Sequence, residues 1–249
     1  FDVRSVIVTD DIASAVPVER HKRRGIAGML PVFKAAAVAA DAGKSMEEVF
    51  RIATEANSRV RTLGVAFSGC TLPGANKPLF EVAAGTMEVG MGIHGEPGLY
   101  RMKAPSADGL AQILTEKLLS EIPPMVKNSA GLRIGVMLNS LGTVKHEELF
   151  VLYRKIEQLL SEHGLIIVEP VVGEFITSFD MAGVSLTLFW LNEEMEETWL
   201  APADTPAFHR NPRLVDDYHL DDNPSRNPIP ASVQAIETEA IIAGSAESQ

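Results

Sequence analysis

The chain has 249 residues, of which 46% are hydrophobic, so it can bury the core of one large domain or of two modest ones. Its formal net charge of −11 at pH 7 argues against a nucleic-acid partner, because no stripe of basic residues is present to replace the counterions of phosphate groups. The single cysteine, Cys70, allows no intrachain disulfide, which fits a reducing cytoplasm. No apolar run reaches the ~18 residues of a membrane span and no signal peptide is visible, so we expect a cytoplasmic protein without a membrane partner.

Residues 1–61 predict the C-terminal part of a first α/β domain. The β-branched apolar run at 3–8 is typical of a buried parallel strand. Because a single strand makes no sheet, we expect partner strands before it and interpret the chain as the C-terminal part of a longer protein. A cleaved tag or a genuine N-terminal strand would also explain this start. The basic run at 20–24 predicts a solvated loop or, alternatively, a contact to phosphate or to an acidic partner surface.

Two helices complete this part of the chain. The first is expected over about 29–42 and ends before Gly43, a residue suited to the C-terminal cap. The second is expected over about 46–60, and Ser45 with Glu48 forms a capping box at its start. Its apolar residues share one face at helical spacing: Met46, Val49, Phe50, Ala53, Ala56 and Val60.

Residues 62–201 predict a second α/β domain in which strands and helices alternate without strict order. The strands are expected at 62–68, 79–82, 86–93, 133–139, 165–172 and 184–191, and the helices at about 106–121 and 146–163. This pattern favours a mixed sheet with helices on one face. The predicted fold class is therefore α/β, with the end of a three-layer parallel-sheet domain followed by a mixed-sheet domain.

Residues 202–249 predict an acidic, proline-rich linker or tail. The segment holds eight acidic and three basic residues, so it contributes −5 to the net charge. This composition is typical of a solvated spacer. We expect it to lead to a further domain, with residues 209–230 packing little against the body. A C-terminal extension that docks on a second protomer is the alternative.

The stretch at 87–98 has the strongest functional character in the chain. It reads Met-Glu-Val-Gly-Met-Gly-Ile-His-Gly-Glu-Pro-Gly, so that four glycines surround His94. Glycine tolerates positive φ and a close approach to the backbone, so such a loop can present an imidazole in the open. An ordinary glycine-rich turn with a solvent-facing histidine is the alternative. The match of 90–95 to G-x-G-x-x-G does not indicate a dinucleotide site, because no helical pattern begins before Ser106.

The sequence Gly-Ile-His-Gly-Glu-Pro-Gly at 92–98 resembles the active-site loop of the substrate-binding subunit of dihydroxyacetone kinases. Further motifs follow the order of that family: Arg-Arg-Gly-Ile-Ala-Gly at 23–28, Thr-Leu-Gly-Val-Ala-Phe-Ser-Gly-Cys-Thr-Leu-Pro-Gly at 62–74, Leu-Asn-Ser-Leu-Gly at 138–142 and Thr-Ser-Phe-Asp-Met-Ala-Gly at 177–183. The resemblance covers roughly residues 2–208. The runs at 9–14 and 201–207 are most similar to the branch that phosphorylates four-carbon ketoses such as erythrulose.

The resemblance implies that His94 is the catalytic residue and that its imidazole adds to the ketone of a short-chain ketose, giving a hemiaminal. It also implies that Gly92, Ile93 and Gly95 bind the substrate. Glycerol has no carbonyl and forms no adduct, whereas a bound ketose has its terminal hydroxyl fixed for phosphoryl transfer. The attacking nitrogen must be unprotonated, so an acceptor should hold the proton on the other nitrogen. Glu96 is the candidate orienter, and a surface or structural carboxylate is the alternative.

Two parts of the family's machinery are not found in the sequence. The Gly-Gly-Gly-Ser-Gly-His motif and the Lys and Asp of the ketose pocket precede the matched region, so we expect a missing N-terminal part of the same fold to complete the pocket. No P-loop, protein-kinase signature or run of metal-binding acids is visible, so we expect no metal and no cofactor in this chain.

The resemblance also implies partners for the chain. The phosphoryl donor is ATP–Mg or a phosphotransferase-system donor, carried by a nucleotide-binding helical domain or subunit, and the protein is a homodimer. A non-catalytic small-molecule-binding or regulatory relative is the alternative function, and a plain α/β domain of unrelated role is a third.

Overall fold

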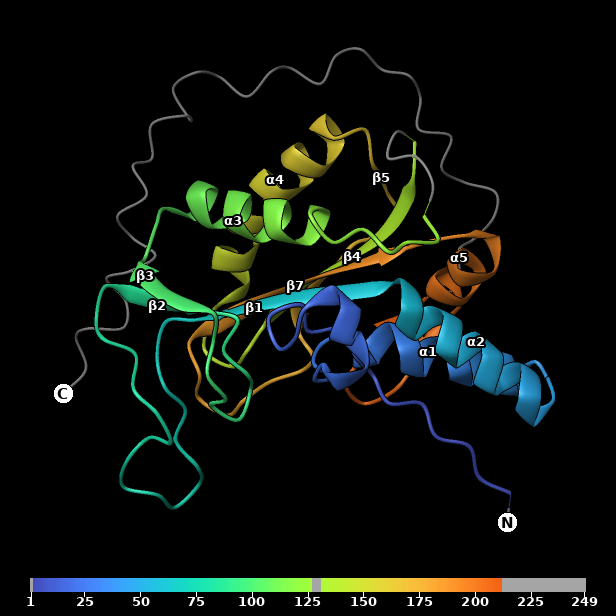
Figure 1. Cartoon of the computed structure of the whole chain (residues 1–249), viewed down its shortest axis with the longest axis horizontal. Coiled ribbons are helices and arrows are strands. Elements are labelled where there is room, and N and C mark those ends of the chain that lie inside the picture. Colours follow the sequence, from blue (N-terminus) through green and yellow to red (C-terminus); the bar gives the residue numbers. More distant parts are fainter. Residues whose placement is uncertain (1, 127–130, 212–249) are drawn as a thin grey trace.

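One mixed sheet forms the centre of the molecule (Figure 1). The computed structural model describes residues 2–126 and 131–211. Within them the strands are β1 (Val60–Ala66), β2 (Thr86–Val89), β3 (Tyr100–Lys103), β4 (Arg133–Ser140), β5 (Ile166–Ile167), β6 (Val171–Glu174) and β7 (Gly183–Trp190). Their order is β3-β2-β1-β7-β4-β5, and β6 also pairs with β4. Because β4 runs parallel to β5 and β6 while the other pairs are antiparallel, the predicted mixed α/β sheet is confirmed.

The three long strands β1, β7 and β4 make the rigid middle of the sheet. β1 pairs with β7 from Val60 opposite Phe189 to Ala66 opposite Gly183. Every residue of β1 and β7 is buried. Strands buried on both faces need helices on both sides, which is what the structure provides.

Helices α3 (Ala107–Leu119) and α4 (His146–Glu162) lie together on one face of the sheet (Figure 1). Alternate strand residues point toward them, because successive side chains of a strand face opposite sides. The core on this face joins both helices to β1, β4 and β7: Leu63, Val65, Leu110, Leu114, Leu118, Val136, Leu138, Leu149, Leu152, Ile156, Leu160, Leu186 and Leu188. The expectation of helices on one face holds for these two helices of the 62–201 segment, but α5 (Glu193–Leu200), which was not predicted, lies on the opposite face.

The other face carries α1 (Met29–Asp41), α2 (Met46–Arg59) and α5 (Glu193–Leu200). They share a second core with the opposite strand residues: Val32, Ala35, Ala39, Ile52, Ala53, Ala56, Val60, Met137, Phe189, Met195 and Trp199. The helices before residue 62 therefore pack directly on the mixed sheet, and the division of the chain at 61/62 stays a prediction. In the part of the chain that the structure describes, no helix has the length and apolar character that a bilayer crossing requires.

Both predicted helices of the first segment are confirmed, together with their caps. Gly43 follows α1 at φ +69°, and the capping box of Ser45 and Glu48 precedes α2. The predicted apolar face of α2 is only partly correct, because Met46 and Phe50 are exposed while Ile52 is buried.

The prediction of a buried strand at 3–8 is wrong for the described residues. No strand is assigned there, and Val3 and Ile7 are 74% and 77% exposed. A strand needs a neighbouring strand, and the described residues offer none to this segment. The side chain of Asn57 in α2 takes two of its backbone groups instead: its Nδ2 donates to Ile7 O over 2.9 Å and its Oδ1 accepts from Thr9 N over 2.9 Å.

Other strand predictions need smaller corrections. Residues 79–82 form no strand, the strand predicted at 86–93 is only β2, and the strand predicted at 165–172 is two short strands, β5 and β6. β3 pairs with β2 and was not expected. Its side chains are mostly exposed, so it lacks the apolar pattern by which a strand is recognised.

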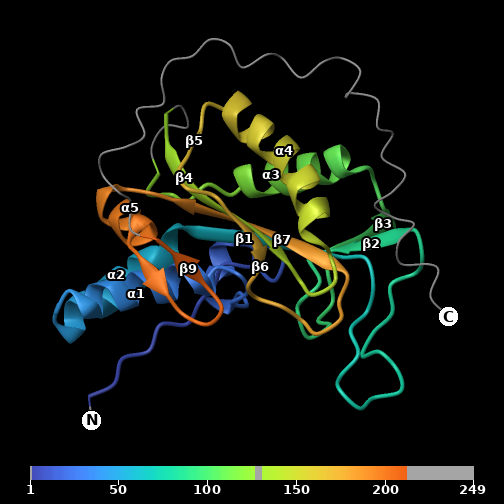
Figure 2. The same ribbon diagram turned by 180° about the vertical axis from the view of Figure 1, so that it is seen from behind.

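The start of the predicted tail is ordered against the body. Residues 203–204 and 209–210 form a small hairpin of β8 (Ala203–Asp204) and β9 (His209–Arg210), which is visible beside α5 in Figure 2. The ring of Phe208 lies 5.8 Å from that of Phe175, and the Arg210 guanidinium lies 5.0 Å from the Trp199 ring. The tail therefore packs on the core as far as Arg210, and the rest of the predicted linker, 212–249, lies outside the described residues.

The carboxylate of Asp10 anchors the first helix to the sheet. It is fully buried and accepts hydrogen bonds from the backbone N–H groups of Ile26, at 2.8 Å, and Gly28, at 2.7 Å, just before α1 begins. Burial raises the pKa of Asp10, and the hydrogen bonds from Thr62, Ile26 and Gly28 offset that rise only in part. Asp10 thus supplies acceptors to donors that would otherwise have no partner in the core.

We expect Asp10→Ala to lower the free energy of unfolding by about 3 kcal/mol, because two buried N–H groups lose their acceptor at about 1–3 kcal/mol each. Urea unfolding followed by circular dichroism measures the change. The matched control is Asp41→Ala, since Asp41 is exposed at the end of the same helix and its removal should change stability by less than about 0.5 kcal/mol. Equal effects of the two substitutions would contradict the anchoring role.

Candidate functional site

The loop that carries His94 lies at the sheet edge where β1 and β4 end and β7 begins. These ends meet because β7 is antiparallel to both of its neighbours. Gly90 N donates to Gly64 O over 2.7 Å, which ties the end of β2 to β1. The loops 67–85, 90–99 and 175–182 extend beyond this same edge, and Ser178 Oγ donates to Ile93 O. Three segments far apart in the sequence are thereby brought around one histidine.

The backbone of the loop makes a tight turn that depends on glycine. Gly92 N donates to Glu96 O over 3.0 Å, and Gly95 N donates to Gly92 O over 3.0 Å. Gly90 and Gly95 have φ values of +78° and +85°, a region that residues with a Cβ rarely adopt. The His94 side chain on this turn is therefore oriented by the backbone of the loop and not by packing in the core.

His94 stands open to solvent, with its side chain 79% exposed. The Glu96 carboxylate contacts it twice: Oε2 accepts from His94 N over 3.1 Å, and Oε1 lies 3.2 Å from Nδ1. This leaves Nε2 as the ring nitrogen without a partner among the described residues. The structure therefore brings Glu96, the predicted orienter, to Nδ1 of His94.

Glu96 is held in its ionised form by its surroundings. Partial burial raises its pKa, but the hydrogen bonds from its own backbone N–H and from His94, together with the charge of Arg24, outweigh burial, and the pKa lies below its usual value. The Arg24 guanidinium is 3.9 Å from Glu96 Oε2. An ionised carboxylate is the form that accepts an N–H from the imidazole.

Arg24 and Asp11 form a layer behind the loop that sequence reasoning missed. Arg24 Nε donates to Asp11 Oδ2 over 2.9 Å, and Arg24 NH2 donates to Gly90 O over 3.1 Å. Burial raises the pKa of Asp11, and the charge and hydrogen bond of Arg24 oppose that rise. Both residues lie in motifs that are visible in the sequence, at 9–14 and 23–28, but nothing in either motif points to the His94 loop.

The basic run at 20–24 is not the solvated loop that its composition suggests. Arg23 is buried and pairs with Glu121 over 2.7 Å, and Arg20 donates to the carbonyl of Asn57 near the end of α2. Only His21 and Lys22 of the run are exposed. Its arginines therefore serve as internal ties between elements.

The other predicted substrate-binding residues line the same turn. A Cβ on Gly92 would lie 2.0 Å from Glu96 Oε2 and 2.6 Å from Arg24 NH1, so these two side chains close directly over this glycine. Ile93 packs partly on a small core of Ala66, Cys70, Leu141 and Met181, so its side chain faces the body.

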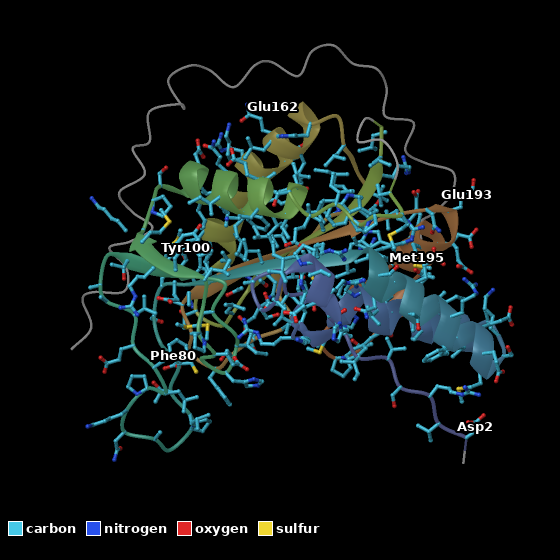
Figure 3. The ribbon with its side chains drawn as sticks, viewed as in Figure 1. Asp2, Phe80, Tyr100, Glu162, Glu193 and Met195 are labelled. Carbon is cyan, nitrogen blue, oxygen red and sulfur yellow. The ribbon has the colours of Figure 1, made fainter. Side chains whose placement is uncertain are left out.

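Phe80 packs against the loop that carries His94. It belongs to the loop between β1 and β2, is labelled in Figure 3, and packs on the small core that holds Cys70. A Cβ on Gly95 would lie 2.4 Å from Phe80 Cδ1. Gly95 thus meets two demands at once, a positive φ and contact with an aromatic ring.

The comparison of the sequence with family models decides the identity of the fold. The Dak1 domain model matches residues 1–207. The chain belongs to the Dak1 domain family. This Dak1 chain is 59% identical over 203 residues to an L-erythrulose kinase of Pectobacterium atrosepticum, covering 82% of the chain and 34% of that relative. It is 43% identical over 206 residues to the dihydroxyacetone-binding subunit DhaK of the PTS-dependent dihydroxyacetone kinase 2 of Listeria innocua, covering 83% of the chain and 60% of that relative.

Solved structures give the same fold. The native dihydroxyacetone kinase of C. freundii matches this Dak1 chain with a TM-score of 0.73 at 32% identity, covering 88% of the chain and 40% of the kinase. The dihydroxyacetone kinase operon co-activator Dha-DhaQ matches with a TM-score of 0.72 at 31% identity, covering 81% of the chain and 61% of the co-activator. The chain thus spans about a third of the erythrulose kinase and somewhat under two thirds of the DhaK subunit.

The described residues offer no group of three or more His, Cys, Asp or Glu side chains that could hold a metal ion. The chemistry available at the loop is that of one exposed imidazole backed by a carboxylate. Such a pair can present an unprotonated ring nitrogen to an electrophile.

We expect Gly95→Ala to destabilise the loop more than Gly74→Ala does. Both glycines have a similar positive φ, +85° and +80°, but a Cβ at Gly74 would meet nothing within 4 Å. Gly74→Ala should cost about 1 kcal/mol for backbone strain alone, and Gly95→Ala about 1–3 kcal/mol more for the collision with Phe80.

Hydrogen exchange of the amides at 91–98 and urea unfolding measure the two costs. In a Phe80→Ala background the excess cost of Gly95→Ala should disappear, as a double-mutant cycle would show. Equal costs in the unaltered background would mean that Phe80 does not support the loop.

Proposed function

We propose that the chain is the ketose-binding part of a dihydroxyacetone- or erythrulose-type kinase, and that His94 binds the ketone of a short-chain ketose as a hemiaminal. The observation that carries this proposal is the exposed imidazole whose Nδ1 faces the Glu96 carboxylate while Nε2 has no partner among the described residues. The chain is 59% identical to an L-erythrulose kinase but only 43% identical to a dihydroxyacetone-binding subunit. This difference supports a four-carbon ketose as the favoured substrate.

The bond-forming step follows from the arrangement of the two side chains. The Nε2 lone pair of His94 attacks the carbonyl carbon, and the N–C bond forms as the carbonyl π electrons move to oxygen. That oxygen takes a proton from a water molecule, and Nδ1 gives up its proton through Glu96 to the hydroxide that is left, so the adduct is a neutral hemiaminal and Glu96 is again ionised. Glu96 is ionised for this role because its pKa lies below the usual value.

The adduct explains both selection and positioning. A polyol such as glycerol has no carbonyl and gains nothing from His94, so a ketose is selected by the reaction itself. Gly92 and Gly95, which carry no side chain, make room for the Glu96, Arg24 and Phe80 side chains that support the turn, and Ile93 fixes the turn to the body through Ser178. The covalent bond then holds the terminal hydroxyl still, and positioning supplies much of the rate enhancement in phosphoryl transfer.

The phosphoryl donor, in this proposal, sits on another domain or subunit. A C. freundii dihydroxyacetone kinase has been solved in complex with AMP-PNP and Mg²⁺, and the Listeria relative is described as PTS-dependent. We propose that the donor is ATP–Mg or a phosphotransferase-system donor, carried by a helical nucleotide-binding partner. We also propose that a further N-terminal part of the fold completes the ketose pocket, and that the protein is a cytoplasmic homodimer.

A regulatory role is the second candidate function. The co-activator Dha-DhaQ has a TM-score of 0.72 and 31% identity to the chain, so this fold also occurs in a protein described as a co-activator. The erythrulose kinase is nearly twice as similar in sequence, which favours the kinase role. Ketose binding through His94 without phosphoryl transfer by the full-length protein would favour the regulatory role.

We expect erythrulose or dihydroxyacetone labelled with ¹³C at the carbonyl carbon to form a tetrahedral adduct on the full-length protein. The ¹³C resonance should move from the ketone region to that of a carbon bearing oxygen and nitrogen. His94→Ala should abolish the shifted resonance, because in this proposal the attacking nitrogen belongs to His94.

The matched control is His209→Ala. His209 is also an exposed histidine whose Nδ1 faces a carboxylate, Asp204 Oδ1 at 2.7 Å, but it lies on the β8–β9 hairpin. This variant should keep the adduct, and labelled glycerol should show no shift. A tetrahedral resonance that persists in His94→Ala would sink the assignment.

We expect the purified 249-residue chain to transfer no phosphoryl group from ATP–Mg to a ketose. It shows no nucleotide-binding motif and spans about a third of the erythrulose kinase. A coupled assay for ADP release, with the full-length protein as positive control, measures this. Ketose-dependent turnover by the chain alone, at a rate that follows the protein through purification, would refute the proposal of a separate donor.

A further inference from the structure

We propose that Arg24 is a positioning residue for His94: its guanidinium fixes the Glu96 carboxylate against Nδ1, so that the imidazole carries its proton on Nδ1 and leaves Nε2 free. This inference deepens the proposed function and rests on His94 being the nucleophile. The side chain of Arg24 itself contacts Asp11, Gly90 and Glu96 and makes no hydrogen bond to the imidazole.

The geometry gives Arg24 two directed hydrogen bonds and one longer charge contact. Nε donates to Asp11 Oδ2 at 2.9 Å, NH2 donates to Gly90 O at 3.1 Å, and NH1 lies 3.9 Å from Glu96 Oε2. Its side chain is 22% exposed and that of Asp11 is 2% exposed, so the guanidinium is anchored on the buried side. One planar cation therefore connects the body of the domain to the carboxylate that faces His94.

The backbone of Arg24 is fixed as well. Arg24 N donates to Ser14 Oγ over 3.0 Å, and Arg24 O accepts from Asp11 N over 3.2 Å. Asp11 in turn accepts from Ala13 N over 3.0 Å through its Oδ1. Since the backbone of Arg24 is held by Ser14 and Asp11 and its Nε by Asp11, the position of NH1 is set mainly by the body of the domain.

Gly92 supplies an independent observation. Its missing Cβ would lie 2.6 Å from Arg24 NH1 and 2.0 Å from Glu96 Oε2, so the cation and the carboxylate pack together over the turn. An arginine serves here because its fork of donors reaches Asp11, Gly90 and Glu96 at once. A lysine offers a single point charge on a flexible stem and cannot hold this geometry.

The experiment measures the tautomer of His94 directly. Long-range ¹H–¹⁵N correlation spectra of the ¹⁵N-histidine-labelled full-length protein distinguish Nδ1–H from Nε2–H without any ketose. We expect Nδ1–H to predominate in the unaltered protein and Nε2–H to gain in Arg24→Met, because Glu96 is no longer held at Nδ1. The affinity for the labelled ketose should fall about tenfold, the size expected when one charge-assisted interaction is lost.

The matched control is Arg101→Met. Arg101 pairs with Glu88 over 2.9 Å on the neighbouring β2–β3 pair, so it is also an arginine–glutamate pair near the loop but forms no hydrogen bond or ion pair with His94 or Glu96 among the described residues. It should change neither the tautomer nor the affinity. A tautomer change in Arg101→Met equal to that in Arg24→Met would mean that any loss of positive charge suffices, and would overturn the proposal.

Arg24→Lys keeps the test decisive if Arg24→Met fails to fold. A lysine keeps a positive charge beside the buried Asp11 carboxylate but cannot reach Asp11, Gly90 and Glu96 at once, so it should raise the Nε2–H form in the same direction. Predominant Nε2–H in the unaltered protein would overturn the proposal without any variant, as would an unchanged tautomer in folded Arg24→Met.

The outcomes also separate this inference from the proposed function. If the tautomer responds to Arg24→Met but no ketose adduct forms in the unaltered protein, the positioning role stands and the hemiaminal fails. If the adduct forms and neither tautomer nor affinity responds to Arg24→Met, the hemiaminal stands and the positioning role fails.

Discussion

Two neighbouring buried carboxylates, on Asp10 and Asp11, tie the helical side of the molecule to the loop that carries His94. Asp10 holds the backbone just before α1, and Asp11 holds Arg24, which reaches the loop at Gly90. Burial raises the pKa of both groups, so each depends on the donors around it. A shift of the backbone at Asp10 and Asp11 would therefore disturb both the packing of the first helix and the position of Arg24 behind the imidazole.

The topology of the sheet decides where the functional loop can lie. β7 runs antiparallel between β1 and β4, so the ends of two strands and the start of a third share one edge. All three strands are buried along nearly their whole length, which makes that edge a fixed platform. The loops beyond it carry His94, Phe80 and Ser178, and a rigid scaffold with functional loops is a common arrangement of binding sites.

The site combines an exposed imidazole with three charged side chains behind it, and each of these is more buried than the one before. His94 is 79% exposed, Glu96 is 39% exposed, Arg24 is 22% exposed and Asp11 is 2% exposed. Charges are thus held by partners whose own positions are set in the core. The Dak1 fold occurs both in kinases and in a protein described as a co-activator, so function within it must depend on such local arrangements and not on the fold itself.

The sequence by itself determined the features that depend on neighbouring residues: the caps of α1 and α2 at Gly43 and Ser45, the helical periodicity of α4, the glycine turn around His94, and the short contact from His94 to Glu96 two residues later. The family followed from several motifs in a fixed order, because such an order is far more specific than any single turn. Only the tertiary structure decided that the run at 3–8 pairs with no strand among the described residues, and that Arg24, 66 residues before Gly90, stands behind the imidazole. The reason is physical: periodicity and capping are local, whereas strand partners and ion pairs depend on which distant segments the sheet brings together.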